Sequence, residues 1–331
     1  MNHTPSGSLL LSKAIPGFIN YKTAEGLSPR TIDSDERLLN KWLEHIGDQK
    51  IGSISTQDII SYISWLRIEY TPHRYNGKTH PLSPKTLRNV WVTLSSFYSW
   101  AAQELGVAQI MKDVTAPRAK ETPIEPLSQE GVQRMLKVCV YSREAHPSNR
   151  RSFIMRLSYG HRDQAIILTL IDTGLRAMEL CKLMIANIDL KTGRVEVKHG
   201  VIGGAKGGKG RTVYLGKAAR RDIWRYLADR DDADDFNEPV FLAQHGHPFN
   251  PNSLRQLIKG IADRTEIKDV YPHKFRHTFA ITYLRSGGDI FTLQALLGHS
   301  SLEMVHHYAQ IAEVDIEQAH RKASPADNWR L

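Results

Sequence analysis

Cysteine is nearly absent from this 331-residue sequence, which contains only Cys139 and Cys181. Two thiols cannot form a disulfide framework or a cysteine-based zinc site, and they are typical of small buried side chains in a reducing compartment. Long apolar runs are absent as well, because the longest, residues 165–171, is far shorter than the roughly 20 residues that cross a bilayer. The apolar segment near the N-terminus is too short for a signal peptide. We therefore expect a cytoplasmic protein with no membrane partner.

Acidic residues are in the minority. The chain has 35 of them against 44 lysines and arginines, which gives a formal net charge of +9 and a pI of about 9.4. A basic balance of this size favours an anionic partner, with nucleic acid ahead of an anionic membrane. The hydrophobic content of 41% is ordinary for a globular protein, and the length is comfortable for two domains.

The first third of the chain has the pattern of a helical bundle. Two similar openings, LSPRT at residues 27–31 and LSPKT at residues 82–86, each place a serine before a proline. A serine hydroxyl suits the N-cap because it accepts an orphan N–H group, and proline suits the first helical position. Ser55, with Asp58 three residues later, predicts a capping box at the start of a third helix. Apolar residues with helical spacing follow these starts, so we expect helices over about residues 10–110.

Two of these helix starts also carry basic residues. Arg30 and Lys85 lie in the first turn, where free N–H groups favour phosphate oxygens. Arg88, three residues further on, is a third candidate for DNA contact. The pattern fits both a plain helical bundle and a bundle that holds DNA phosphates.

A proline-rich break divides the chain. Residues 116–126 contain three prolines and mixed charge without apolar periodicity, as is typical of a linker. We expect a helical domain at residues 1–115 and a second domain at residues 127–331. In the second, helical segments flank two stretches with strand alternation, RVEVKHG and RTVYLG, which predict a small antiparallel hairpin or a three-stranded sheet. The expected fold class is mainly α with a small antiparallel β-sheet.

Five short stretches of the second domain carry the residues of chemical interest. They are TGLRAMEL with Arg176 and Glu179, GGAKGGKGR with Lys206 and Lys209, PHKFRHTFA with His273, Arg276 and His277, LLGHSS with His299, and HHYAQ with Tyr308. The glycine-rich stretch nearly matches a nucleotide-binding P-loop, but Gly210 stands where Ser or Thr must hold magnesium, and a strand follows instead of a helix. The two histidines four residues apart lack an HExxH pattern and a nearby cysteine, so no zinc site is predicted.

Together, the five stretches resemble the tyrosine recombinase, or phage integrase, family. The resemblance lies in the order Arg, Lys, His-x-x-Arg, His, Tyr, in the flanking TGLR, PHxxRH and LGH, and in the tyrosine nine residues beyond the last histidine (308 − 299). It covers nearly the whole chain, with the N-terminal helices similar to a core-binding domain and the rest similar to a catalytic domain. It implies a site-specific recombinase that cleaves and rejoins DNA through a 3′-phosphotyrosine, for integration, excision or resolution of DNA elements, without metal or other cofactor.

The resemblance also implies a role for each motif residue. Tyr308 is the expected nucleophile. Arg176 and Arg276 are expected to bind the non-bridging phosphate oxygens, because guanidinium forks make paired, charge-assisted hydrogen bonds. His299 is expected to donate to the same oxygens and to help stabilise the negative charge of the transition state.

The remaining roles concern protons and support. His273 is implied as the general base for the tyrosine, and Lys206 as the general acid that protonates the leaving 5′-oxygen. Lys209 lies in the same flexible turn, so it remains an alternative acid and is otherwise a DNA-binding candidate. Glu179, three residues after Arg176, is either a supporting residue that orients basic groups or an exposed helix acid.

The family further implies a homotetramer on two double-stranded DNA sites. The polar tail after Tyr308 is then expected to pack into a neighbouring subunit, with Trp329 as its anchor. The connection at residues 142–164 is longer than usual for the family, which leaves its DNA or partner contacts open.

Three other functions compete with this one. A type IB topoisomerase shares the cleavage chemistry but works as a monomer, and the two-domain layout and the tail argue against it. A recombinase-derived module that binds DNA without cutting is disfavoured, because competent residues occupy all the catalytic positions. A structural basic protein leaves the aligned residues unexplained.

Overall fold

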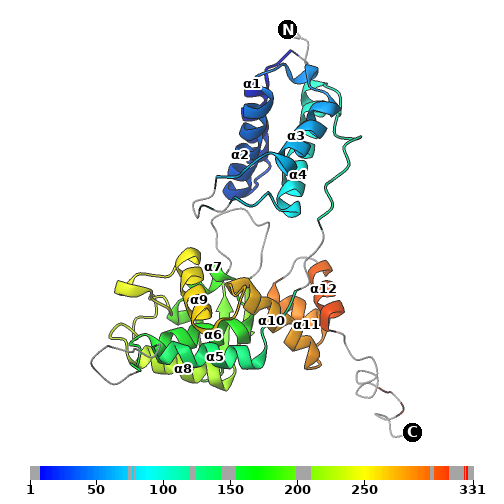
Figure 1. The fold of residues 1–331 in the computed structure, drawn as a ribbon. Helices are drawn as coiled ribbons and strands as arrows, with labels where there is room; N and C mark the ends of the chain where they lie inside the picture. The colour runs from blue at the N-terminus through cyan, green and yellow to red at the C-terminus, as the bar shows by residue number, and fades with distance from the viewer. Residues whose placement is uncertain are drawn as a thin grey trace. The chain divides into compact units, whose positions relative to one another are not determined.

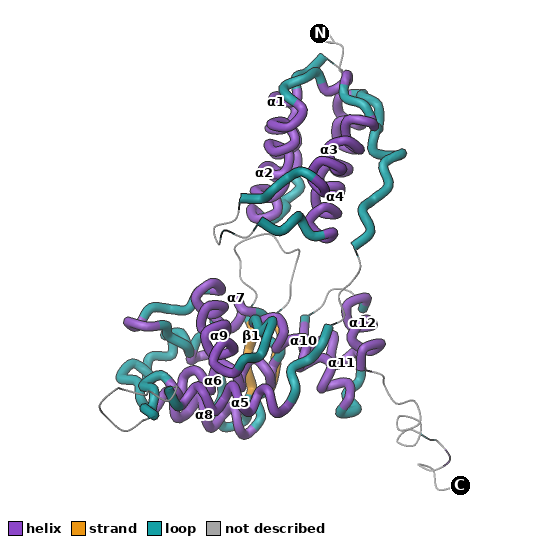
Figure 2. The backbone as a smooth tube through the Cα atoms, viewed as in Figure 1, coloured by secondary structure: helices purple, strands orange, loops and turns teal. Residues whose placement is uncertain are grey.

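The computed structural model describes residues 8–73, 77, 79–119, 124–142, 154–198, 210–298, 302–312, 324 and 326. The described residues form two compact units, one before residue 123 and one after it. Helices dominate both units, as Figures 1 and 2 show. A two-stranded antiparallel sheet lies in the second unit. The expected fold class, mainly α with a small antiparallel sheet, is therefore confirmed.

The described residues of the first unit form a bundle of four α-helices. Its helices are α1 (Leu11–Ala24), α2 (Pro29–Ile46), α3 (Thr56–Ile68) and α4 (Pro84–Leu105), with a short 3₁₀ turn at Ile51–Ser53. Ser28 caps α2 by accepting the N–H of Thr31, Ser83 caps α4 by accepting the N–H of Thr86, and a proline follows each serine. Ser55 and Asp58 form the expected capping box, with both of its hydrogen bonds present. The three predicted helix starts are confirmed, because local capping chemistry is enough to specify them.

Aromatic side chains fill much of the core of this bundle. Trp42 of α2 is fully buried and donates to the hydroxyl of Tyr98 on α4 at 3.3 Å. Phe18 of α1 meets Phe97 edge to face, with ring centroids 5.5 Å apart. These contacts join three of the four helices, so the bundle has a core of its own.

The second unit contains the remaining helices and the sheet. Its elements are α5 (Gln129–Val140), α6 (Gly160–Thr173), α7 (Ala177–Cys181), β1 (Arg194–Val197), β2 (Arg211–Tyr214), α8 (Lys217–Ala228), α9 (Pro251–Thr265), α10 (Pro272–Arg285), α11 (Ile290–Leu297) and α12 (Glu303–Ala312), with 3₁₀ turns at Ile185–Asn187 and Gln244–Gly246. The strands pair antiparallel, with Arg194 opposite Tyr214 and Val197 opposite Arg211. Of the two predicted alternatives, the described residues form the two-stranded one.

Helix α6 lies at the centre of this unit. It packs against α5, α8 and α10, and Ile166, Ile167 and Leu170 on it are fully buried. The helix begins at Gly160, three residues before Asp163, where the sequence pattern predicts its start. Arg162 and Asp163 in its first turn form a buried ion pair of 2.8 Å instead of facing solvent. Residues 143–153 of the expected insertion lie outside the described residues.

A second apolar cluster joins α10, α11 and α12, which lie side by side in Figure 1. Its buried members are Ala280, Ile281, Leu284, Leu293, Leu297, Val305, Tyr308 and Ala312. This cluster places the predicted nucleophile inside a hydrophobic core. Among the helices that the structure describes, none has both the length and the apolar character needed to cross a membrane.

Candidate active site

The second unit gathers most of the residues that the motifs single out. Lys206, Lys209, His299 and Trp329 lie outside the described residues, so their placement stays a prediction. The described motif residues are Arg176, Glu179, His273, Arg276, His277 and Tyr308. They come from α7, α10 and α12 and from the residues just before α7.

Tyr308 on α12 is completely buried, with an exposed fraction of 0%. Its hydroxyl and Nδ1 of His277 share a hydrogen bond of 2.8 Å. The ring itself packs in the apolar cluster with Leu293 and Leu297 of α11. The hydroxyl is therefore held at a fixed position against α10, and its ring is held by α11.

The Tyr308 hydroxyl and the His277 ring are both neutral near pH 7. Burial, reinforced by the neighbouring His273 and Arg276, lowers the pKa of His277 to about 4. Burial also raises the pKa of Tyr308, and this outweighs the opposite influence of Arg276 and Arg176.

His273 is one turn before His277 on α10 and is exposed. Its ring lies 4.6 Å from the ring of His277, nearly perpendicular to it. The motif implies His273 as the base, whereas the ring in contact with the tyrosine hydroxyl is that of His277. Sequence reasoning quoted His277 without giving it a role, although its four-residue spacing from His273 on one helix was a signal that both rings share a face.

Arg276 is also fully buried, yet its guanidinium is well paired. Nη1 donates to the carbonyl of Gly174 at 2.9 Å, and Nη2 donates to that of Leu297 at 2.6 Å. Burial lowers the pKa of Arg276 to about 10, so the side chain remains protonated near pH 7. Gly174 ends α6 with φ +61°, and a Cβ there would lie 2.5 Å from the Phe279 ring, so the turn that offers its carbonyl to Arg276 requires glycine.

Arg176 is the more accessible of the two motif arginines. It stands directly before α7, and its side chain is 37% exposed. Nη1 pairs with Glu179 Oε1 at 2.9 Å, and Nη2 donates to the carbonyl of Gly298 at 3.3 Å. A guanidinium that is fixed on one side and open on the other is suited to bind an anion from solvent.

Glu179 is the centre of a charged network. Its carboxylate accepts the backbone N–H and the guanidinium of Arg176, at 2.7 and 2.9 Å. It also accepts both Nη groups of Arg211, at 2.8 and 2.7 Å. Burial alone raises the pKa of Glu179, but the two arginines overcome this and lower it to about 2. Of the two readings left open, the exposed helix acid is wrong, because the side chain is only 12% exposed.

Arg211 is the residue that sequence reasoning passed over. It begins β2, and its side chain is only 9% exposed between Glu179 and α11. A signal was available, because Arg211 is the last letter of the K-G-x-K-x-R stretch that contains both turn lysines.

In the first unit, the DNA-contact candidates are exposed. Arg30 lies in the first turn of α2, Lys85 lies in the first turn of α4, and Arg88 follows in the second turn of α4. Their exposure is compatible with phosphate contact, which stays a prediction.

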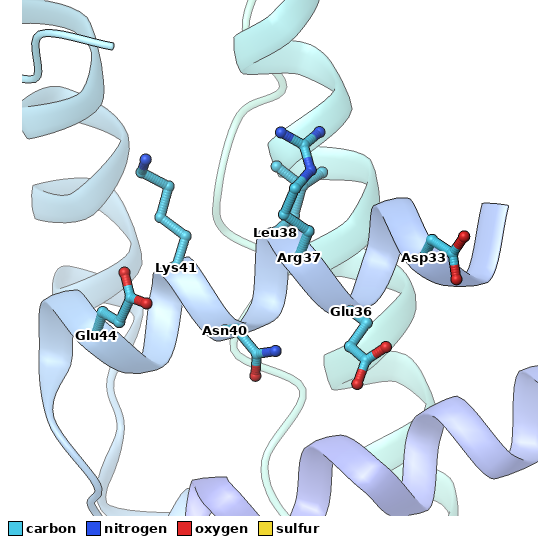
Figure 3. A pocket seen from close by; sticks show the side chains of 7 residues that line it. All are labelled: Asp33, Glu36, Arg37, Leu38, Asn40, Lys41 and Glu44. Atoms are coloured by element: carbon cyan, nitrogen blue, oxygen red, sulfur yellow. The ribbon is translucent and has the colours of Figure 1, made fainter. Parts of the chain in front are cut away.

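A groove also runs along α2. Its lining residues are Asp33, Glu36, Arg37, Leu38, Asn40, Lys41 and Glu44. Figure 3 shows Arg37 and Lys41 projecting to one side of α2, while Glu36 and Asn40 project to the other. The lining contains acidic and basic groups in similar numbers, so it does not favour an anion, and none of its residues belongs to the motifs.

Two family models match the chain. The phage integrase family model matches residues 127–314, more than half of the chain. The model of the phage integrase N-terminal SAM-like domain matches residues 15–106.

Curated relatives match over most of their length. Tyrosine recombinase XerC of Alcanivorax borkumensis is 30% identical, over 93% of this chain and 92% of its own. Tyrosine recombinase XerD of Listeria innocua is 26% identical, over 95% and 99% respectively. Tyrosine recombinase XerA of Pyrococcus furiosus is 26% identical, over 96% of both chains.

Solved structures share the fold. The Tn1549 transposon integrase, in complex with circular intermediate DNA, matches with a TM-score of 0.72 at 19% identity, over 96% of this chain and 100% of its own. The lambda integrase dimer bound to a core site matches with a TM-score of 0.67 at 14% identity, over 93% and 81%. XerH site-specific recombinase, bound to its palindromic difH substrate, matches with a TM-score of 0.62 at 16% identity, over 98% of both chains.

Proposed function

This chain belongs to the phage integrase family and is a tyrosine-type site-specific DNA recombinase, and we propose that Tyr308 is its nucleophile. The observation that carries this proposal is the convergence of Tyr308, Arg176 and Arg276 on the last residues of α11. Tyr308 lies in the apolar cluster that includes Leu297, Arg276 donates to the carbonyl of Leu297, and Arg176 donates to the carbonyl of Gly298. His299 follows directly in the sequence.

In the proposed reaction, the Tyr308 oxygen attacks a DNA phosphorus and the bond from phosphorus to the 5′-oxygen breaks. The 3′-phosphate becomes esterified to Tyr308, and Lys206 donates the proton that the leaving 5′-hydroxyl takes up. Rejoining is the same step in reverse, with a 5′-hydroxyl as the nucleophile. The phosphotyrosine conserves the bond energy, so the proposal requires no ATP, metal or other cofactor.

Negative charge grows on the phosphate oxygens in this reaction, and the proposed donors to them are Arg176, Arg276 and His299. Arginine suits this task because its fork is planar and stays charged. Tyr308 and Arg276 have no exposed surface, so a phosphate can reach them only after α12 shifts. We assign that shift to DNA binding.

The proton of Tyr308 passes to the histidine pair of α10. His277 is the first acceptor, since its Nδ1 is 2.8 Å from the hydroxyl and its lowered pKa leaves the ring neutral. His273, the base that the motif implies, is the exposed ring beside it. The pair links a buried hydroxyl to solvent.

The proposed partner is double-stranded DNA. Support comes from the net charge of +9 and from solved relatives that are bound to DNA. The proposed DNA-binding residues are Arg30, Lys85, Arg88 and Lys209. Exposed lysines and arginines at helix starts position phosphates without reading bases.

We assign DNA binding and catalysis to the predicted domains. Residues 1–115 form the core-binding domain, residues 116–126 form the linker, and residues 127–331 form the catalytic domain with its exchange tail. The working assembly is a homotetramer on two DNA sites in the cytoplasm.

A covalent trapping assay tests the nucleophile. The protein is incubated in EDTA with DNA from the flanks of its gene, nicked so that religation fails, and then run on a denaturing gel. We expect a protein–DNA adduct with wild type and none with Tyr308→Phe, which keeps the ring in its apolar cluster and removes only the hydroxyl. An adduct with the variant, or no wild-type adduct on DNA that the protein demonstrably binds, contradicts the proposal.

A further inference from the structure

Three successive carbonyls end α11, and each accepts a hydrogen bond from a different arginine. Arg211 Nε donates to Leu296 at 2.7 Å, Arg276 Nη2 to Leu297 at 2.6 Å, and Arg176 Nη2 to Gly298 at 3.3 Å. These are the carbonyls that a helix C-terminus leaves without intrahelical partners, and they carry partial negative charge. The end of α11 is therefore anchored by three cations just before His299.

Arg211 differs from the other two arginines in the hydrogen bonds that its guanidinium makes. Its Nε donates to Leu296, and Nη1 and Nη2 form a two-pronged pair with Glu179. All three nitrogen atoms of its guanidinium are thus engaged inside the protein, and the side chain is only 9% exposed. Each nitrogen of Arg211 therefore already donates one hydrogen bond within the protein, and little of the side chain is open to a phosphate.

The backbone is shaped to admit this side chain. Gly298 ends α11 with φ +63°, and a Cβ there would lie 3.1 Å from Arg211 Cδ and 3.2 Å from its Nη1. Both the positive φ and the close approach favour glycine at this position. Helix α11 and strand β2 pack together at this point.

The geometry points to Arg211 as a positioning residue of the recombinase reaction, an inference that rests on the proposed function. Arg211 joins the Glu179 carboxylate to the last turn of α11. Glu179 in turn holds the backbone and guanidinium of Arg176. Arg211 thereby sets the distance between Arg176 and the residue that leads into His299, without touching DNA itself.

Lysine cannot replace arginine here. The planar guanidinium donates at once to two carboxylate oxygens and to a carbonyl, whereas a compact ammonium cannot reach all three in this geometry. The test compares Arg211→Lys with Arg230→Lys, a matched control in the same unit. Arg230 is 8% exposed, pairs with Asp232 through Nε and Nη2 at 2.7 and 2.8 Å, and donates to the carbonyls of Pro239 and Val240. None of these partners belongs to the site.

The readouts are the single-turnover rate of adduct formation at saturating protein, the Kd for the same DNA, and the thermal midpoint. We expect Arg211→Lys to slow adduct formation on the order of 100-fold, as for a small misplacement of reacting groups, with Kd changed by less than about threefold. Arg230→Lys is expected to lower the thermal midpoint similarly but to leave the rate within about threefold of wild type.

A double-mutant cycle with Glu179→Gln gives a second measurement. Because Arg211 acts through Glu179, the double variant is expected to be no slower than the slower single variant. If Arg211→Lys does not fold, Glu179→Gln alone must slow adduct formation on the order of 100-fold with an unchanged Kd for DNA.

Several outcomes overturn the inference alone. One is a wild-type rate of adduct formation for Arg211→Lys or for Glu179→Gln. The others are additive losses of rate in the double-mutant cycle, or equal losses of rate in Arg211→Lys and Arg230→Lys. Absence of any adduct with wild type overturns the proposed function and the inference with it. The wild-type lane therefore distinguishes the two failures.

Discussion

The two sides of the candidate site are stabilised in opposite ways. Around Tyr308, apolar side chains of α10, α11 and α12 bury a neutral hydroxyl against the neutral ring of His277. Around Glu179, ion pairs hold Arg176 and Arg211 in place. Charged groups that are proposed to act on a phosphate can be prearranged by pairing with one another, whereas the proposed nucleophile is kept neutral and covered. The charged side is thus assembled in advance, and the proposal requires Tyr308 to be uncovered before it reacts.

The comparison predicts that lysine substitution of the two motif arginines slows adduct formation to a similar extent but lowers stability to very different extents. Arg276→Lys removes a fully buried fork that serves two carbonyls, so we expect adduct formation to fall on the order of 10³-fold and the free energy of unfolding to fall by about 3 kcal/mol. Arg176→Lys, on a more exposed side chain, is expected to lose a similar factor in rate but less than about 1 kcal/mol of stability. Trapping kinetics and urea unfolding measure both quantities. Equal stability losses are inconsistent with the different burial of the two side chains.

The histidine pair offers a smaller, sharper contrast. We expect His277→Gln to slow adduct formation about 100-fold and His273→Gln about tenfold, because the ring of His277 shares a 2.8 Å hydrogen bond with the Tyr308 hydroxyl and His273 is the exposed ring beside it. The two residues lie one turn apart on α10, so each variant controls for the other. The reverse order of effects assigns the base to His273, as the motif implies.

The last prediction concerns the pH dependence of stability, where only part of the effect is observable between pH 5 and pH 3. The pKa of Glu179 is lowered to about 2 in the folded protein. Its ionised form therefore stabilises the fold, and this contribution is fully present above the pKa of an unfolded glutamate, about 4.3. This contribution, roughly 3 kcal/mol, is lost as pH falls from about 4.5 toward 2. Urea unfolding of wild type and Glu179→Gln is therefore expected to show a difference that narrows between pH 5 and pH 3. A constant difference over that range contradicts the ion-pair account.

Local chemistry made much of the fold predictable. The capped starts at Ser28, Ser55 and Ser83 and the strand pair around the glycine-rich turn depend on neighbours a few residues away, and the structure contains them all. The start of α6 was harder to predict, because Arg162 and Asp163 look like surface residues until the structure pairs them.

The candidate site also contains residues that the sequence identified and residues that it did not. The motif spacing selected Arg176, Arg276 and Tyr308, and the structure brings these residues together. It did not select Arg211 or give a role to His277, because their importance lies in contacts with Glu179 and Tyr308, which are 32 and 31 residues away in the chain. No periodicity or capping rule reports contacts at such separations.

The sequence alone thus determined the serine-capped helix starts, the mainly helical fold class, the basic character and the identity of the motif residues, since these follow from local preferences and composition. Only the tertiary structure decided that Tyr308 is buried and neutral, that Glu179 is ionised between two arginines, and that the end of α11 is anchored by three of them. Burial and charge pairing depend on which distant segments meet. The physical state of the reacting groups therefore belongs to the packed chain and not to any one of its motifs.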